Sequence, residues 1–201
     1  MFGPSDISVR WAWAPDRATR REVAWELLRS LVPNPAARIT NTCERCGGPH
    51  GRVRVEYGGV HASVAYAGGW AFACVAPHGD AAAVGVDAES VSDAKRDAAG
   101  LTGIVRAGVI TSIREWTRIE AVLKADGRGL RVDPAGVALI AHGPEWTATV
   151  AGSDREFVGA DVIGPPGIFV SVAFAPVSGE EAQEAASGRA TRSAAAHGSG
   201  R

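Results

Sequence analysis

The chain has 201 residues, 46% of them hydrophobic, and a formal net charge of −1 at pH 7. This length and composition can bury one good core or two small lobes, and the near-neutral charge indicates no polybasic or polyacidic partner and no nucleic acid. Three cysteines give no disulfide framework. The N-terminus has no apolar core of signal-peptide type, and no stretch approaches the ~20 apolar residues of a membrane span. We therefore expect a soluble cytoplasmic protein that does not bind membranes.

The first elements predicted are a strand and a helix. Alternating polar and apolar residues from Val9 to Ala14 indicate a short edge strand. Good helix formers from Arg17 to Leu31 predict a helix that begins after Asp16, which is a suitable N-cap. Its apolar residues recur at helical spacing and should form a core stripe: Val23, Leu27, Leu28 and Leu31.

A C-x2-C-x3-H pattern follows, formed by Cys43, Cys46 and His50. It has the spacing of half a zinc site, but a tetrahedral site needs a fourth ligand, which would have to come from Cys74, His61 or a carboxylate. We expect a loop of packed thiols here, with zinc binding as the alternative.

A strand, a Gly-Gly turn and a second strand are predicted from Val60 to Pro77. Ala81 to Glu89 is then a short apolar run that ends in two acidic residues, as in a buried strand arriving at a surface. Because side chains alternate along a strand, Asp87 and Glu89 should share one face, about 6.5–7 Å apart at Cα. Two such carboxylates repel each other unless a cation lies between them, and Mg²⁺ prefers oxygen ligands.

A helix is predicted from Ile110 to Ala125, ended by Gly127. Trp116, Glu120 and Lys124 follow one another along one side of it. The adjacent arc can pack inward and carries Ile119, Val122 and Leu123.

Glu120 and Lys124 have two interpretations. An i,i+4 surface ion pair would contribute a few tenths of a kcal/mol. Alternatively, Glu120 joins Asp87 and Glu89 as a third carboxylate, with Lys124 beside them as a positive charge for phosphate. The scarcity of lysine in the chain, which has only Lys95 and Lys124, gives this position some weight.

The rest of the chain is predicted to be strands from Leu130 to Ala175. The segments GGWAFACVAP and PGIFVSVAFAP are alike in pattern, which fits two similar lobes. Residues 90–108 should form a shortened loop with little helix. Residues 178–201 have almost no large apolar residue and should be a disordered tail.

The segments VGVDAE (84–89) and WTRIEAVLKA (116–125) together resemble the signature of the 4′-phosphopantetheinyl transferases. The subfamily is the larger, monomeric type that activates peptide and polyketide synthases. Its pattern is V/I-G-V/I-D-x-E, followed by W/F-S/T-x-K-E-A-x-x-K, and both motifs occur here in that order.

The resemblance implies an α+β fold of two similar lobes related by a pseudo-twofold axis, each a small antiparallel sheet with a helix packed on it. The lobes would span residues 1–80 and 81–177. The implied activity is Mg²⁺-dependent transfer of 4′-phosphopantetheine from coenzyme A to a serine of an acyl or peptidyl carrier protein. The protein would act as a monomer, with the carrier protein and coenzyme A as its partners.

The resemblance also implies roles for individual residues. Asp87, Glu89 and Glu120 would hold Mg²⁺. Glu120 would act as the general base, directly or through a water, while Lys124 stabilises the developing charge and Asp87 takes part through the metal.

Coenzyme A would be bound by further residues. Lys124 and an arginine at the start of the first helix, assigned here as Arg20, would contact its phosphates, and Arg52 matches the basic residue of a G-K/R-P turn. Tyr66 stands where the family has a phosphate-binding histidine, and a phenol donates one hydrogen bond without positive charge. Ile119 stands where the family usually has lysine.

Two alternative functions remain. One is a non-catalytic relative that binds coenzyme A or a carrier protein without turnover, which Ile119 and Tyr66 favour. The other is a metal-dependent nuclease, although such sites usually place E-x-K on a strand, whereas Glu120 and Lys124 lie four residues apart on a predicted helix.

Overall fold

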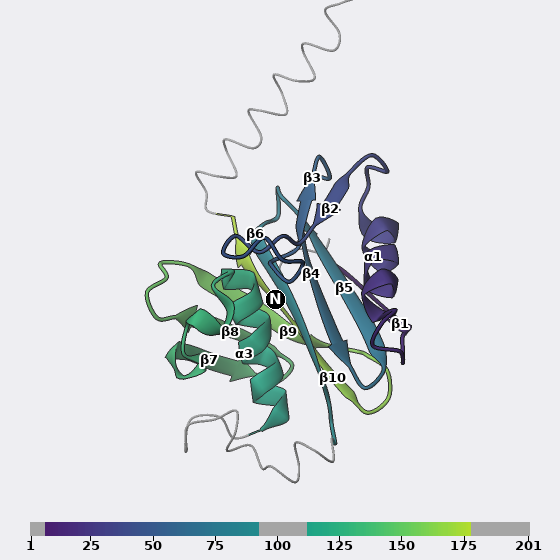
Figure 1. The fold of residues 1–201 in the computed structure, drawn as a ribbon. Coiled ribbons are helices and arrows are strands. Elements are labelled where there is room, and N and C mark those ends of the chain that lie inside the picture. Colours follow the sequence, from purple (N-terminus) through teal and green to yellow (C-terminus); the bar gives the residue numbers. More distant parts are fainter. Residues whose placement is uncertain (1–6, 93–111, 178–201) are drawn as a thin grey trace, which may run out of the picture.

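The computed structural model describes residues 7–92 and 112–177 (Figure 1). The expected shortened loop falls almost wholly, and the expected tail entirely, outside these residues. In chain order the elements are β1 (Ser8–Trp13), α1 (Arg20–Leu31), β2 (Arg38–Thr40), β3 (Arg54–Glu56), β4 (Val60–Ala67), β5 (Trp70–Pro77), β6 (Ala81–Ser90), α3 (Ile113–Asp126), two 3₁₀ turns (Gly129–Arg131 and Pro134–Gly136), β7 (Val137–His142), β8 (Glu145–Val150), β9 (Glu156–Val162) and β10 (Ile168–Pro176).

The described strands form antiparallel sheets, which confirms the α+β class. One sheet has three strands in the order β1-β5-β4, and the other has five in the order β6-β10-β9-β8-β7. The short strands β2 and β3 pair with each other. As expected for an edge strand, β1 pairs on one side only, with β5.

The elements are stacked in layers, with α1 and α3 on opposite sides of the strands (Figure 1). Leu28 of α1 packs against the outer face of the three-stranded sheet. Phe72 of that sheet meets Phe174 of the other in the core between the sheets. Val122 of α3 packs with Trp146 on the outer face of the five-stranded sheet. Burying each of these side chains contributes about 1.5–3 kcal/mol, so these interfaces hold the layers together.

The start of α1 differs from the prediction. The helix begins at Arg20 rather than Arg17, and its N-cap is Thr19, which makes no capping hydrogen bond through its side chain. The Oδ1 of Asp16 instead accepts a hydrogen bond from the backbone N–H of Ala18, 2.9 Å away. Asp16 therefore closes a turn before the helix, and its assignment as the N-cap is wrong.

The expected core stripe of α1 is only partly buried. Leu28 is completely buried, as is Ala24 one turn before it, while Val23, Leu27 and Leu31 are half-buried. In the described part of the chain, no helix is both long enough and apolar enough to cross a membrane.

Candidate functional site

Strand β6 presents two different faces. Val86 is completely buried in the core between the sheets. Ala83 packs on the opposite face, beneath α3. Because side chains alternate along a strand, Gly85, Asp87 and Glu89 continue that second face. The sequence prediction that the two carboxylates share one face agrees with this register.

Gly85 allows α3 to lie directly on β6. A Cβ atom at this position would be 2.5 Å from the backbone nitrogen of Ala125 and closer still to the carbonyl oxygen of Ala121. No side chain fits in that space. The glycine of the VGVDAE segment therefore brings the helix against the strand and places the side chains of α3 beside Asp87.

Both ends of α3 are fixed by local interactions. The Ser112 hydroxyl accepts a hydrogen bond from the Glu115 backbone N–H at 3.1 Å, which caps the first turn. Gly127 adopts a left-handed conformation, with φ = 84°, and its N–H donates to the Leu123 carbonyl. The predicted end of the helix at Gly127 is confirmed, and the described helix starts three residues later than Ile110.

The inward side of α3 is as the sequence predicts, but Trp116, which was expected on the side of Glu120 and Lys124, is also buried in this core. Ile119 is 2% exposed and lies in the core beneath the helix, together with Val122 and Leu123. Glu120 and Lys124 are half-buried at the edge of this core. The position where the resembling family usually has lysine is thus a core position here, so a lysine at 119 would not be a surface contact.

Lys124 bridges the two sheets. Its Nζ atom donates hydrogen bonds to Asp87 Oδ1 at 2.7 Å, to the Val86 carbonyl at 3.1 Å and to the Val64 carbonyl at 3.4 Å. Asp87 and Val86 are on β6, whereas Val64 is on β4 of the other sheet. An ammonium group has three protons, and these three contacts use all of them.

The remaining oxygen of Asp87 has no partner among residues 7–92 and 112–177. The side chain is 9% exposed, and Oδ2 is buried there without a hydrogen bond from any described residue. A buried carboxylate oxygen without a partner is costly unless a cation or donor completes it. Oδ2 therefore fits the role of a ligand for a hard cation such as Mg²⁺.

Glu120 lies in the field of the other two carboxylates. Its pKa is raised above the ordinary 4.5, first by burial and then by the negative charge of Asp87, with a smaller contribution from Glu89, while Lys124 acts in the opposite direction. Asp87 and Glu89 of β6 therefore lie close enough to Glu120 of α3 for their charges to act on it.

The oxygen atoms of these three carboxylates do not lie as close together as the ligands of one metal ion would. Among the described residues, the group of three ligands that does come together is Cys43, Cys46 and His50, whose ligand atoms all lie within 4.8 Å of one another. It stays a prediction that Asp87, Glu89 and Glu120 share one Mg²⁺ ion.

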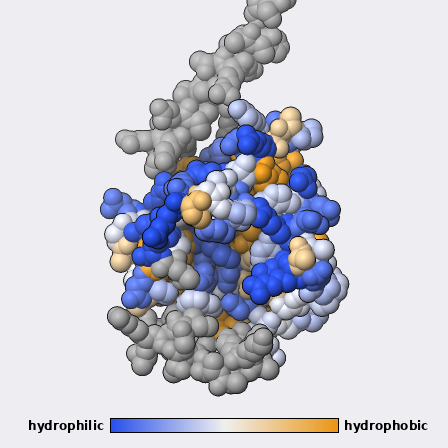
Figure 2. All heavy atoms as spheres, in the orientation of Figure 1, coloured by the Kyte–Doolittle hydropathy of each residue, from blue (hydrophilic) through white to orange (hydrophobic). Residues whose placement is uncertain are grey.

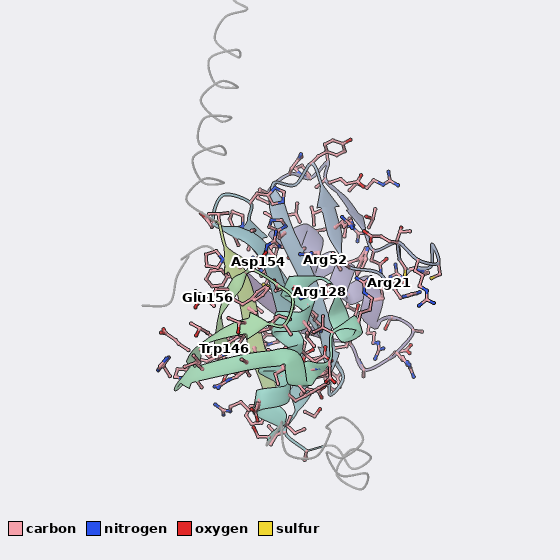
Figure 3. The ribbon with its side chains drawn as sticks, turned by 90° about the vertical axis from the view of Figure 1, so that its left-hand side faces the viewer. Arg21, Arg52, Arg128, Trp146, Asp154 and Glu156 are labelled. Atoms are coloured by element: carbon pink, nitrogen blue, oxygen red, sulfur yellow. The ribbon has the colours of Figure 1, made fainter. Side chains whose placement is uncertain are left out.

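One pocket contains two of the predicted coenzyme-binding residues. Arg52 and Lys124 line a cavity of about 370 Å³ between β4 and the C-terminal end of α3. Figure 3 shows Arg52 and Arg128, which also lines the cavity, next to each other. Burial and the neighbouring arginines Arg54 and Arg155 lower the pKa of Arg52, yet an arginine keeps its charge. The cavity is lined by His50, Gly51, Arg52, Val53, Ala62, Ser63, Val64, Leu123, Lys124, Gly127, Arg128, Gly129 and Arg131.

A second pocket contains the other two predicted coenzyme-binding residues, Arg20 and Tyr66. Arg20 and Tyr66 line a cavity of about 240 Å³ together with Glu89. The Arg20 guanidinium lies 4.8 Å from the centre of the Tyr66 ring, in a cation–π contact. Burial raises the pKa of Tyr66, so its hydroxyl stays protonated and can donate a hydrogen bond. Along β4, the nearest residues of the two pockets, Val64 and Tyr66, are two positions apart, or about 6.5–7 Å.

Several residues of this region were not singled out from the sequence. Ser63 of β4 accepts a hydrogen bond from the Val86 N–H of β6 and so helps Lys124 to join the sheets. Asp126 holds Arg128 by hydrogen bonds at 2.7 and 3.0 Å, which fixes this arginine at the pocket. The D-x-R spacing at the C-terminal end of the helix was the signal that could have indicated the Asp126–Arg128 pair. The face drawn in Figure 2 is mainly hydrophilic, with small hydrophobic areas between the hydrophilic residues.

No family model matches the chain, and the search of curated proteins returns no match.

Proposed function

We propose that this protein transfers 4′-phosphopantetheine from coenzyme A to a serine of an acyl or peptidyl carrier protein. The observation that carries the proposal is the contact between the two motifs. Lys124 of WTRIEAVLKA binds Asp87 of VGVDAE, 37 residues away, and Glu120 lies in the field of Asp87 and Glu89. The two segments of the phosphopantetheinyl transferase signature are therefore in direct contact through the Lys124–Asp87 ion pair, which supports the proposal.

Coenzyme A would be held by the cations of the two pockets. Its pyrophosphate and 3′-phosphate need positive partners, which Arg52 and Lys124 supply in the larger pocket and Arg20 supplies in the smaller one. Tyr66 adds a neutral donor beside Arg20. Because both pockets border β4, a long ligand lying along this strand would reach both.

The carboxylates would serve the reaction itself. Asp87, Glu89 and Glu120 would hold Mg²⁺, whose chemistry there is to neutralise the charge of the pyrophosphate. Glu120 would take the proton of the carrier serine hydroxyl, since its raised pKa makes it a stronger base than an ordinary glutamate. The serine oxygen would form the new bond to phosphorus as the bond to the leaving phosphate oxygen breaks. The products are the modified carrier and adenosine 3′,5′-bisphosphate.

Lys124 would stabilise the charge that develops on the leaving group. Its three protons are used by Asp87, Val86 and Val64, and the contact with the Val64 carbonyl, at 3.4 Å, is the longest. Lys124 would exchange this hydrogen bond to the Val64 carbonyl for one to a phosphate oxygen, and it would keep its proton and its charge.

The family's organisation into two lobes belongs to this proposal. The outer positions of α1 and α3, each on its own antiparallel sheet, support lobes at 1–80 and 81–177 related by a pseudo-twofold axis. We include monomeric and cytoplasmic states in the proposal as properties of the resembling subfamily.

A second function is favoured by the same ion pair. If Lys124 only joins the two sheets, it is a structural bridge, and with Ile119 and Tyr66 the chain would lack three charged contacts to phosphate. The protein would then bind coenzyme A or a carrier protein without turnover.

Intact mass spectrometry distinguishes the two functions. Apo acyl and apo peptidyl carrier proteins are incubated with the protein, coenzyme A and Mg²⁺, and transfer adds one phosphopantetheine to a carrier. Glu120→Gln should abolish this gain, while Glu26→Gln on the exposed face of α1 should preserve it. Calorimetric binding of coenzyme A without any carrier modification would instead support the non-catalytic function.

Calorimetry also tests the metal assignment. In the presence of coenzyme A, Asp87→Ala should remove Mg²⁺ binding, because it deletes the buried oxygen that lacks a partner. Mg²⁺ binding that survives this substitution would show that Asp87 is not a ligand.

A further inference from the structure

Cys43, Cys46 and His50 converge at one point of the loop between β2 and β3. Their ligand atoms all lie within 4.8 Å of one another, and the Cys46 sulfur is 2.9 Å from Nε2 of His50. In a tetrahedral zinc site with Zn–S of about 2.3 Å and Zn–N of about 2.0–2.1 Å, neighbouring ligand atoms are about 3.6–3.8 Å apart. The observed arrangement needs only small side-chain rotations to reach these distances.

The backbone of the loop already has the shape that such a site requires. The Gly47 N–H donates to the Cys43 carbonyl and the Cys43 N–H to the Gly48 carbonyl, both at 2.8 Å, so the two cysteines lie on one tight turn. Gly47 adopts φ = 70°, which favours glycine. The Gly48 N–H donates a hydrogen bond to the Cys46 sulfur at 3.4 Å. Such N–H···S contacts stabilise thiolates.

The two thiols of this loop are not buried in a core. Cys46 is exposed and Cys43 is half-buried. Cys74 and His61, which the sequence offered as fourth ligands, do not join them: Cys74 is completely buried on β5, and the His61 ring lies against that of His78, with ring centres 4.3 Å apart. In the part of the chain that the structure describes, the group consists of three protein ligands.

The loop borders the cavity of about 370 Å³ that Arg52 and Lys124 line. Arg21 of α1 donates to the Pro49 carbonyl at 3.1 Å and to Asn41 Oδ1 at 2.7 Å, and the Gly51 N–H donates to the Asn41 carbonyl at 2.7 Å. These bonds close the loop at its base. The next residue, Arg52, projects into the pocket, and His50 lines the same cavity.

We propose that Cys43, Cys46 and His50 bind one Zn²⁺ ion, with water as the fourth ligand, and that this ion fixes the loop that presents Arg52. Two thiolates and an imidazole favour zinc over a hard cation such as Mg²⁺. The site is separate from the carboxylates of β6 and α3 and does not depend on the proposed transferase activity.

The test uses the full-length, tag-free protein purified in reducing buffer and dialysed against metal-free buffer. Elemental analysis should find one zinc per chain. Replacement by Co²⁺ should give the visible absorption of a tetrahedral site together with a near-ultraviolet thiolate charge-transfer band. Cys46→Ser and His50→Asn should each weaken Zn²⁺ binding at least tenfold, as measured by competition with a chromophoric chelator.

Two matched variants serve as controls. Cys74→Ala removes the cysteine outside the group, and His142→Asn removes an exposed histidine on β7. Both should keep one zinc per chain. The double variant Cys43→Ser/Cys46→Ser should lose the charge-transfer band while keeping the far-ultraviolet circular dichroism spectrum of the folded protein.

Three results would overturn the proposal. The first is a protein that holds no stoichiometric zinc and gives no tetrahedral Co²⁺ spectrum. The second is zinc content that is unchanged in the double variant. The third is a Cys43–Cys46 disulfide that persists in reducing buffer, seen as the loss of two hydrogens by mass, because a disulfide cannot supply two thiolates.

Discussion

Lys124 Nζ and Asp87 Oδ1 are 2.7 Å apart, and this ion pair is the point at which α3, β6 and β4 are joined. The Asp87 side chain is 9% exposed and that of Lys124 is 30% exposed. A pair that is buried to this extent depends on both partners, since either one alone would leave a poorly solvated charge.

Lys124→Met should therefore destabilise the protein by about 3 kcal/mol, because it leaves the Asp87 carboxylate buried without its cation. The free energy of unfolding is measured in urea at pH 7. The double variant Lys124→Met/Asp87→Asn should recover part of the loss. Arg38→Met is the control, because the Arg38–Glu56 pair is exposed and 3.9 Å long, and it should cost less than about 1 kcal/mol. Equal losses in the free energy of unfolding for Lys124→Met and Arg38→Met would contradict the structural role of Lys124.

Gly85→Ala should destabilise the protein by more than about 3 kcal/mol, at or above the upper end for an overpacked core. The added methyl group would meet backbone atoms of Ala121 and Ala125, which cannot rotate away. Gly136→Ala provides the comparison, since its nearest contact is the Ala151 Cβ at 3.1 Å and it should cost less than about 1 kcal/mol. Thermal unfolding of the two variants measures the difference. Similar melting temperatures would show that α3 does not rest on β6 as described.

Glu120→Gln should stabilise the protein at neutral and alkaline pH. The folded pKa of Glu120 is raised above 4.5, so its favourable contribution is present below pH 4.5 and is lost as the pH rises through the folded value. Above that value, the folded state carries a poorly solvated carboxylate, which glutamine removes. We expect the melting temperature to rise by about 1–3 °C at pH 8, on the scale of about 2–4 °C per kcal/mol. The gain should shrink towards pH 4.5, and a lower melting temperature at pH 8 would contradict the prediction.

His61→Gln should reduce the sensitivity of the fold to acid. Burial, followed by the charges of His78, Arg52 and Arg155, lowers the pKa of His61 from 6.5 to about 4. Between pH 6.5 and pH 4, His61 therefore binds a proton in the unfolded chain but stays neutral in the folded protein. Stability that is present above pH 6.5 is lost as the pH falls towards 4. Urea unfolding from pH 7 to pH 4 should show a smaller decline for His61→Gln than for the wild type. His142→Gln, at an exposed position, should decline as the wild type does; if His61→Gln did so too, the assignment would be wrong.

Local features of the chain could be predicted from the sequence. The end of α3 follows from Gly127, whose left-handed conformation is easily adopted without a side chain. The inward side of α3 follows from the spacing of Ile119, Val122 and Leu123, because a helical period fixes which residues share a face. The shared face of Asp87 and Glu89 follows from the alternation of a strand. Each of these depends on residues that are neighbours in the chain.

Contacts between distant segments were decided by the tertiary structure. The sequence predicts that Lys124 contacts phosphate, but it could not show that its three protons are used by β6 and β4. That depends on how closely α3 approaches β6 at Gly85. It also could not separate the Arg52 and Arg20 pockets, which lie on different stretches of β4. The sequence by itself determined which side of an element the candidate residues occupy, because this follows from the backbone period. Only the packing of the layers decided which of them meet, because side-chain contacts depend on long-range burial that no local pattern encodes.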